Sequence, residues 1–179
     1  MTVFTEHTTE SAPSASRRAM TAVAAKQGYL PVGVALLAES PEALEGFLRL
    51  SATFEACTLD PPAQEAVIMT VAARNGCRVC LAMHAARLAA LGEPPSLAEA
   101  LRSAAPLDDA RLEAVRAFTI RALDTAGDVG DEAVAEFLGH GFTRRNALEV
   151  VLGIGACTLS TLANRLTGAP VDEQLQAFA

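Results

Sequence analysis

One stretch of the chain, residues 65–84, combines a glutamate, two cysteines and a histidine at fixed offsets. Cys77 and Cys80 form a C-x-x-C pair. His84 follows the second cysteine by four residues, and Glu65 precedes the first by twelve. An α-helix turns about 100° per residue, so positions 77, 80 and 84 would lie within roughly 60° of one another on one face. Two thiols, an imidazole and a carboxylate are the groups that thiol redox chemistry needs.

The two residues before the first cysteine indicate where one helix ends and another begins. Asn75 and Gly76 suit the left-handed turn that closes a helix, so we expect a new helix to start at Cys77. Unpaired backbone N–H groups and the helix dipole at such a position favour the thiolate and lower the pKa of a cysteine below its ordinary value of about 8.5. This argument alone predicts that Cys77 is the nucleophile.

The histidine and the glutamate predict a path for protons. His84 lies one turn beyond Cys80 and could take the proton of that thiol or stabilise its thiolate. Glu65 lies in an otherwise apolar segment, where burial should raise the pKa of a carboxyl and fit it for proton transfer near neutral pH. We therefore predict a relay from carboxylate to imidazole to thiol.

The rest of the chain must position these groups, and its periodicity is helical almost throughout, with no convincing strand alternation. Residues 61–74 are apolar on nearly every side, which is typical of a buried helix, and Asp60 can cap its start. We expect the other helices at residues 16–27, 41–57, 77–91, 96–103, 108–126, 131–140 and 143–167. The predicted fold class is all-α: a single compact helical domain over residues 16–179, after a disordered lead rich in Thr, Ser and Glu at residues 1–15.

Composition limits the class of protein. The 179 residues are 51% hydrophobic, which exceeds what a lone small domain needs, so we expect a homo-oligomer. The formal net charge is −7 and no basic stripe is present, which argues against a nucleic-acid partner. Four cysteines are too few for a secreted disulfide scaffold, and no apolar run at the N-terminus is long enough for a signal peptide. The apolar run at residues 147–163 is short for a membrane span. These features predict a cytoplasmic protein with no membrane partner.

The E-x11-C-x2-C-x3-H spacing, with Asn-Gly before the first cysteine, resembles the active-site signature of the alkylhydroperoxidase D-like branch of the carboxymuconolactone decarboxylase superfamily. Residues 147–166, which contain the pair Asn164-Arg165, are similar to the long C-terminal helix of that family. The resemblance covers roughly residues 25–175. It implies an all-helical fold that assembles into oligomers, often trimers or hexamers.

The resemblance also implies an activity, the reduction of (alkyl) hydroperoxides without a bound cofactor. One thiolate attacks the O–O bond and becomes a sulfenic acid, and the second thiol resolves it to a disulfide. An external dithiol, carried by a lipoylated or thioredoxin-like partner, then reduces the disulfide. Carried over by position, Cys80 is the peroxide-reacting thiol, assisted by His84 with Glu65 behind it, while Cys77 resolves or meets the reductant. The helix-dipole argument prefers Cys77 as nucleophile, so the order of the two roles stays open.

Two features of the motif depart from the family pattern. Some relatives carry a further histidine inside the C-x-x-C, where this chain has Arg78 and Val79. Arg78 could lower the pKa of a neighbouring thiol but cannot shuttle a proton. The decarboxylase branch typically lacks the cysteine pair, which disfavours lactone chemistry here.

Alternative interpretations apply to each of these residues. The same two thiolates, imidazole and carboxylate could bind zinc in a tetrahedral site, and a third possibility is an inert helical scaffold. Cys57 and Cys157 are expected to be small buried apolar residues. His140 is expected at a helix C-terminus, and His7 is expected to be exposed in the disordered lead.

Overall fold

A computed structural model describes residues 3–179, and every regular element in that range is helical. The elements are α1 (Ser14–Gln27), α2 (Val32–Leu37), α3 (Pro41–Glu55), α4 (Pro61–Arg74), α5 (Arg78–Ala90), α6 (Pro95–Arg102), α7 (Ala110–Asp124), α8 (Asp131–Gly139), α9 (Arg144–Thr167) and a closing 3-10 helix η1 (Glu173–Phe178). The predicted all-α class is therefore confirmed over the described residues.

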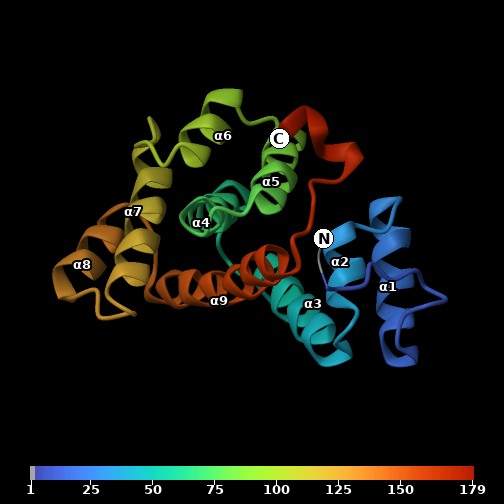
Figure 1. Ribbon diagram of the computed structural model, residues 1–179. Coiled ribbons are helices and arrows are strands. Elements are labelled where there is room, and N and C mark those ends of the chain that lie inside the picture. The colour runs from blue at the N-terminus through green and yellow to red at the C-terminus, as the bar shows by residue number, and fades with distance from the viewer. Residues whose placement is uncertain (1–2) are drawn as a thin grey trace.

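Helix α4 forms the centre of the fold, with α5, α6, α7 and α9 packed around it (Figure 1). All residues from Ala63 to Ala72 are buried, as expected for a helix that is apolar on nearly every side. The Asp60 side chain accepts a hydrogen bond from the backbone N of Ala63 at 3.1 Å, which caps the start of the helix. The predicted boundaries of this helix are confirmed, and its burial is what places Glu65 inside the protein.

Helix α9 is the longest element and runs along one side of the molecule against α3, α4 and α7 (Figure 1). A Cβ atom at Gly153 would lie 2.6 Å from the Phe54 ring and 2.9 Å from Val67, so glycine permits this close packing. By length and composition alone α9 could cross a membrane. The core helix of a globular protein meets the same criterion, and 39% of its most apolar stretch is buried in the fold.

The N-terminal part of the chain packs on the body of the protein as a second, smaller core. Met20 of α1 and Val34 of α2 are buried together with Leu44 of α3. Helices α1 and α2 thereby cover the side of the molecule where α3 and α9 meet (Figure 1). The six residues of α2 were missed from the sequence, because so short a helix shows no period; η1 was missed for the same reason.

The expectation of a disordered lead is wrong for the residues of it that are described, 3–15, since helix α1 already begins at Ser14. Ala12 is 1% exposed, and the side chain of His7 is 11% exposed with its Nε2 2.7 Å from Oε2 of Glu39. The polar residues that suggested disorder instead close a turn, in which the Thr8 backbone N donates to Oγ of Ser11 at 2.9 Å. His7 is therefore not the exposed histidine that we expected.

Candidate functional site

The turn between α4 and α5 places the first cysteine, as the sequence predicted. Gly76 adopts a φ of +62°, and Cys77 is the N-cap residue of α5. Two side chains of α9 hold this turn: Thr161 Oγ1 accepts from Asn75 Nδ2 at 2.8 Å, and Arg165 Nη1 donates to the Gly76 carbonyl at 2.8 Å. The start of α5 is thus fixed by a helix that lies some eighty-five residues further along the chain.

The two motif cysteines form a reduced pair with their sulfurs 3.2 Å apart. The hydrogen bond between the two sulfurs is the largest cause that lowers the pKa of Cys77 to about 6. Burial opposes the shift, while the backbone N–H groups of Cys80 and Val79 and the side chain of Asn164 favour it. The same bond and burial raise the pKa of Cys80. The two shifts favour a thiolate at Cys77 and a protonated thiol at Cys80.

The predicted contact between the carboxylate and the imidazole is present. Nδ1 of His84 lies 2.6 Å from Oε2 of Glu65, whose side chain is 1% exposed. The other oxygen, Oε1, forms an ion pair with Arg87, whose Nε lies 3.0 Å away. Sequence reasoning missed Arg87, although its position three residues after His84 places both on one helix face.

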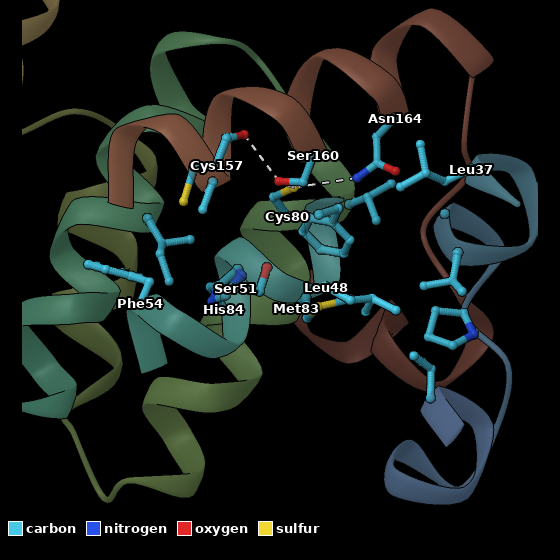
Figure 2. A pocket seen from close by; sticks show the side chains of 18 of the residues that line it. Leu37, Leu48, Ser51, Phe54, Cys80, Met83, His84, Cys157, Ser160 and Asn164 are labelled. Carbon is cyan, nitrogen blue, oxygen red and sulfur yellow. Dashed lines mark hydrogen bonds between the residues drawn. The ribbon is translucent and has the colours of Figure 1, made fainter. Parts of the chain in front are cut away.

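A cavity of about 220 Å³ joins the thiol pair to the histidine (Figure 2). Cys80 and His84 both line it, while Cys77 lies behind its wall. Among the described residues, His84 makes no hydrogen bond to either sulfur, so a molecule inside the cavity would have to complete the relay. Most of the wall is apolar and comes from α1, α2, α3, α5 and α9, including Val23, Val34, Leu37, Leu48, Phe54 and Met83.

A line of alternating charges runs from the surface to the buried carboxylate. Lys26 Nζ lies 3.3 Å from Oε2 of Glu55, and Nη1 of Arg87 lies 2.9 Å from the other oxygen of that glutamate. Arg87 then reaches Glu65 in the interior. Lys26, Glu55 and Arg87 also line the cavity. The arrangement balances the charge of Glu65 and gives the apolar cavity one polar edge.

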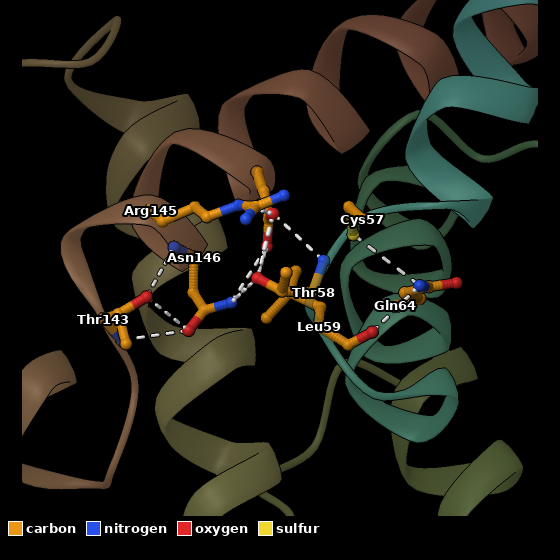
Figure 3. A network of polar contacts seen from close by, with 8 residues as sticks. Cys57, Thr58, Leu59, Gln64, Thr143, Arg145 and Asn146 are labelled. Atoms are coloured by element: carbon orange, nitrogen blue, oxygen red, sulfur yellow. Dashed lines mark hydrogen bonds and ion pairs between the residues drawn. The ribbon is translucent and has the colours of Figure 1, made fainter.

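A second polar cluster, which the sequence did not indicate, joins α9 to the loop before α4 (Figure 3). Glu149 accepts from the backbone N of Thr58 at 3.0 Å and from its hydroxyl at 2.7 Å. Asn146 Nδ2 and Arg145 Nε donate to the same carboxylate, each at 2.9 Å. We call Thr58, Asn146, Arg145 and Glu149 the Glu149 cluster. Each oxygen of this carboxylate accepts hydrogen bonds from neighbouring protein groups.

The structure also shows where the two remaining cysteines and His140 lie. Cys57 is half-buried beside the Glu149 cluster, with Gln64 Nε2 3.6 Å from its sulfur, so the expectation of full burial is wrong for it. Cys157 is buried as expected, and burial raises its pKa to about 12. His140 is the C-cap residue of α8, which confirms the expected position at a helix end.

The zinc alternative finds no support in the geometry. Residues 3–179 hold no group of three or more His, Cys, Asp and Glu side chains placed to share a metal ion. The two oxygens of Glu65 are taken up by other side chains, one in a hydrogen bond with His84 and the other in an ion pair with Arg87.

Comparison with known proteins agrees with the resemblance seen in the sequence. The Carboxymuconolactone decarboxylase family profile matches residues 38–121. Among solved structures, the chain is similar to an uncharacterized peroxidase-related protein from Ralstonia eutropha JMP134, described as an alkylhydroperoxidase AhpD core. The TM-score is 0.85 and the identity 20%, over 97% of this chain and 94% of that one. A peroxidase-related protein from Silicibacter sp. TM1040 gives a TM-score of 0.78 at 21% identity, over 91% and 87% of the two chains.

A third similar structure has a different activity. It is a cysteine-to-alanine variant of the debrominase Bmp8 in complex with 2,3,4-tribromopyrrole, with a TM-score of 0.76 and 16% identity, over 99% of this chain and 96% of that one. No curated protein matched the sequence. At these identities the structural likeness establishes the fold, and the fold alone does not fix the reaction.

Proposed function

We propose that this chain belongs to the alkylhydroperoxidase D-like branch of the carboxymuconolactone decarboxylase superfamily and is a thiol-dependent peroxidase and disulfide reductase. In this proposal Cys77 and Cys80 reduce organic hydroperoxides. One observation carries it: a reduced pair of sulfurs 3.2 Å apart, one of which lines an apolar cavity that also contains an imidazole paired with a buried carboxylate. The peroxidase-related neighbours support this class of reaction.

The two sulfurs differ in acidity and in access to the cavity. Cys77 holds the resting charge but is 2% exposed and lies outside the cavity wall. Cys80 lines the cavity, and in this proposal it holds the proton of the hydrogen bond that joins the two sulfurs. We propose that this proton passes to Cys77 along the hydrogen bond, which leaves Cys80 as the attacking thiolate. The roles implied by the family resemblance and by the helix dipole are thereby compatible.

The chemical steps balance as follows. The Cys80 thiolate attacks the outer oxygen of ROOH, the O–O bond breaks, and Cys80 becomes a sulfenic acid while RO⁻ departs. His84, whose Nδ1 is hydrogen-bonded to Glu65, donates a proton to RO⁻, which gives ROH, and regains its proton from solvent. The Cys77 thiol then attacks the sulfenic sulfur, its proton leaves with the hydroxide as water, and the Cys77–Cys80 disulfide forms. The hydroperoxide is reduced by two electrons and the dithiol is oxidised by two.

The depth of the thiol pair bears on the reductant. Both sulfurs belong to residues that are at most 6% exposed, so a rigid dithiol on a protein surface would not reach them without rearrangement. A dithiol on a long flexible arm, such as a lipoyl group, could enter the cavity and exchange with the disulfide. We therefore favour a lipoylated partner over a thioredoxin-like one, with no bound cofactor.

Assembly and location complete the proposal. Leu148, Leu162 and Leu166 of α9 are 73%, 55% and 72% exposed, and such an apolar face supports the homo-oligomer, trimer or hexamer, that we propose. A thiol pair that must be returned to its reduced form suits a reducing compartment, which supports a cytoplasmic location.

Steady-state kinetics test this function directly. The purified chain should reduce cumene hydroperoxide with dihydrolipoamide as electron donor, and Cys77→Ser and Cys80→Ser should each abolish turnover. Cys57→Ser is the matched control, because that thiol lies beside the Glu149 cluster rather than in the motif. Full turnover in either motif variant would refute the proposal.

A further inference from the structure

A single side-chain amide of α9 approaches both sulfurs of the thiol pair. Nδ2 of Asn164 lies 3.5 Å from Sγ of Cys80 and 3.8 Å from Sγ of Cys77, distances suited to a hydrogen bond that ends on the large sulfur atom. Figure 2 shows this amide aimed at Cys80 from the opposite wall of the cavity. We infer that Asn164 is a catalytic residue of the proposed peroxidase, donating a hydrogen bond to whichever sulfur carries the negative charge. This inference rests on the proposed function.

The position of the amide is fixed from two sides. A Cβ atom at Gly33 of α2 would lie 2.6 Å from Oδ1 of Asn164, so glycine leaves the space that the amide oxygen needs. The next residue, Arg165, donates to the Gly76 carbonyl, and Thr161, one turn earlier on α9, accepts from Asn75. The helix that carries the amide is therefore tied to the turn that carries Cys77.

Asn164 can stabilise a negative charge on either sulfur, which the backbone N–H groups at the start of α5 cannot do. The backbone N–H groups at the start of α5 favour charge on Cys77 only, whereas Cys80 needs the charge to attack a peroxide. Asn164 is closer to Cys80 and can stabilise the charge after the proton has moved. Ser160 is a weaker candidate, since its Oγ lies 3.9 Å from Cys80 and donates to the Cys157 carbonyl at 3.1 Å.

Thiolate titration separates this role from a structural one. Thiolate absorbance near 240 nm and the rate of alkylation by iodoacetamide, followed against pH, measure the charge on the pair without any peroxide. In Asn164→Ala we expect the lower thiol pKa to rise by about 1 and alkylation below that pKa to slow about tenfold, because one hydrogen bond to a charged group is lost. Peroxide turnover should fall by a similar factor. Asn164→Asp should shift the titration further, since it replaces the donor with a negative charge.

Two more variants serve as second probe and control. Gly33→Ala should shift the titration in the same direction by a smaller amount, because it displaces the amide without removing it. Thr158→Ala, on the same helix but outside the cavity wall, should titrate like the wild type. The other charged groups at the cavity, His84, Arg87, Glu55 and Lys26, are the same in every variant and do not account for a difference.

The outcomes distinguish this inference from the proposed function. If Asn164→Ala and Gly33→Ala both titrate like the wild type, the inference is wrong, whatever the activity. If the titration shifts as expected in a protein that does not reduce peroxides, the amide acts on the sulfurs and the proposed function is wrong. Should Asn164→Ala fail to fold, the titration of Gly33→Ala decides between the two results.

Discussion

Two buried glutamates, Glu65 and Glu149, have similar immediate surroundings but differ in the groups that lie beyond them. Glu65 is 1% exposed and Glu149 is 7% exposed, and each pairs with an arginine, Arg87 or Arg145. The Glu149 cluster joins a loop to a helix and consists of side chains bound to one another (Figure 3). The hydrogen bonds of Glu65 continue to His84, which lines a cavity (Figure 2). Burial and ion pairing therefore do not mark a site, and neither does a neighbouring hollow, because Glu149, Arg145 and Cys57 also line one. Glu65 differs in its hydrogen bond to a histidine that shares a cavity with a thiol of the C-x-x-C pair.

The cysteines near the two glutamates show the same difference. Burial raises the pKa of Cys57, and the charge of Glu149 raises it further. At Cys77, hydrogen bonds from Cys80 and from the start of α5 outweigh burial and lower the pKa to about 6. Hydrogen bonds, not exposure, separate the thiol whose pKa is lowered from the thiol whose pKa is raised.

The largest expected effect concerns activity. Glu65→Gln replaces the carboxylate that is hydrogen-bonded to Nδ1 of His84, and we expect peroxide turnover to fall about 100-fold, as for the loss of a general acid. Glu149→Gln makes the same chemical change in the other region and should leave kcat within about twofold of wild type. Steady-state kinetics on the two variants measures the contrast, and equal losses would show that the regions do not differ as we describe.

The second effect concerns stability and runs the other way. Glu149→Gln weakens several charge-assisted hydrogen bonds between the loop at Thr58 and helix α9, so the free energy of unfolding should fall by about 2 kcal/mol. A glutamine at position 65 can still make polar contacts, although with fewer partners. Glu65→Gln should therefore lower the free energy of unfolding by less than Glu149→Gln does. Urea denaturation of both variants gives the comparison, and a larger loss for Glu65→Gln would contradict it.

The third effect is a pH dependence of the thiols. Because the pKa of Cys77 is lowered to about 6, its thiolate is present above that pH and is lost as the pH falls through it. Alkylation at pH 5 should therefore be about tenfold slower than at pH 7. In the Cys77→Ser variant that midpoint should disappear. A single midpoint near pH 8.5 in the wild type would contradict the assignment.

The smallest expected effect is at the half-buried thiol of the Glu149 cluster. Cys57→Ser should leave turnover unchanged and shift the free energy of unfolding by no more than about 1 kcal/mol, because the side chain only fills space and accepts one weak hydrogen bond. A loss of peroxide turnover in this variant would mean that the reactive thiol lies beside the Glu149 cluster, which contradicts our proposal.

The features that depend on neighbouring residues could be predicted from the sequence. The apolar run of α4, the Asn75-Gly76 turn and the helix start at Cys77 are each set by neighbouring residues, and all three were predicted. The contact of Glu65 with His84 followed from their spacing, because both lie on helices that pack together.

Groups brought together by tertiary packing could not be predicted in this way. Asn164 reaches the sulfurs across more than eighty residues of chain, and Glu149 reaches Thr58 across ninety-one. The ordered turn before α1 was also missed, because Thr8 and Ser11 have the composition of a disordered segment and form hydrogen bonds that composition does not show. The cavity depends on the packing of six helices and has no local signal.

Peptide mapping after oxidation tests the central claim most directly. The reduced protein is treated with one equivalent of cumene hydroperoxide, remaining thiols are alkylated, and peptides are identified by mass spectrometry without reduction. We predict a single Cys77–Cys80 disulfide, with Cys57 and Cys157 recovered as alkylated thiols. Recovery of Cys77 and Cys80 as free thiols, or oxidation that begins at Cys57, would contradict the account.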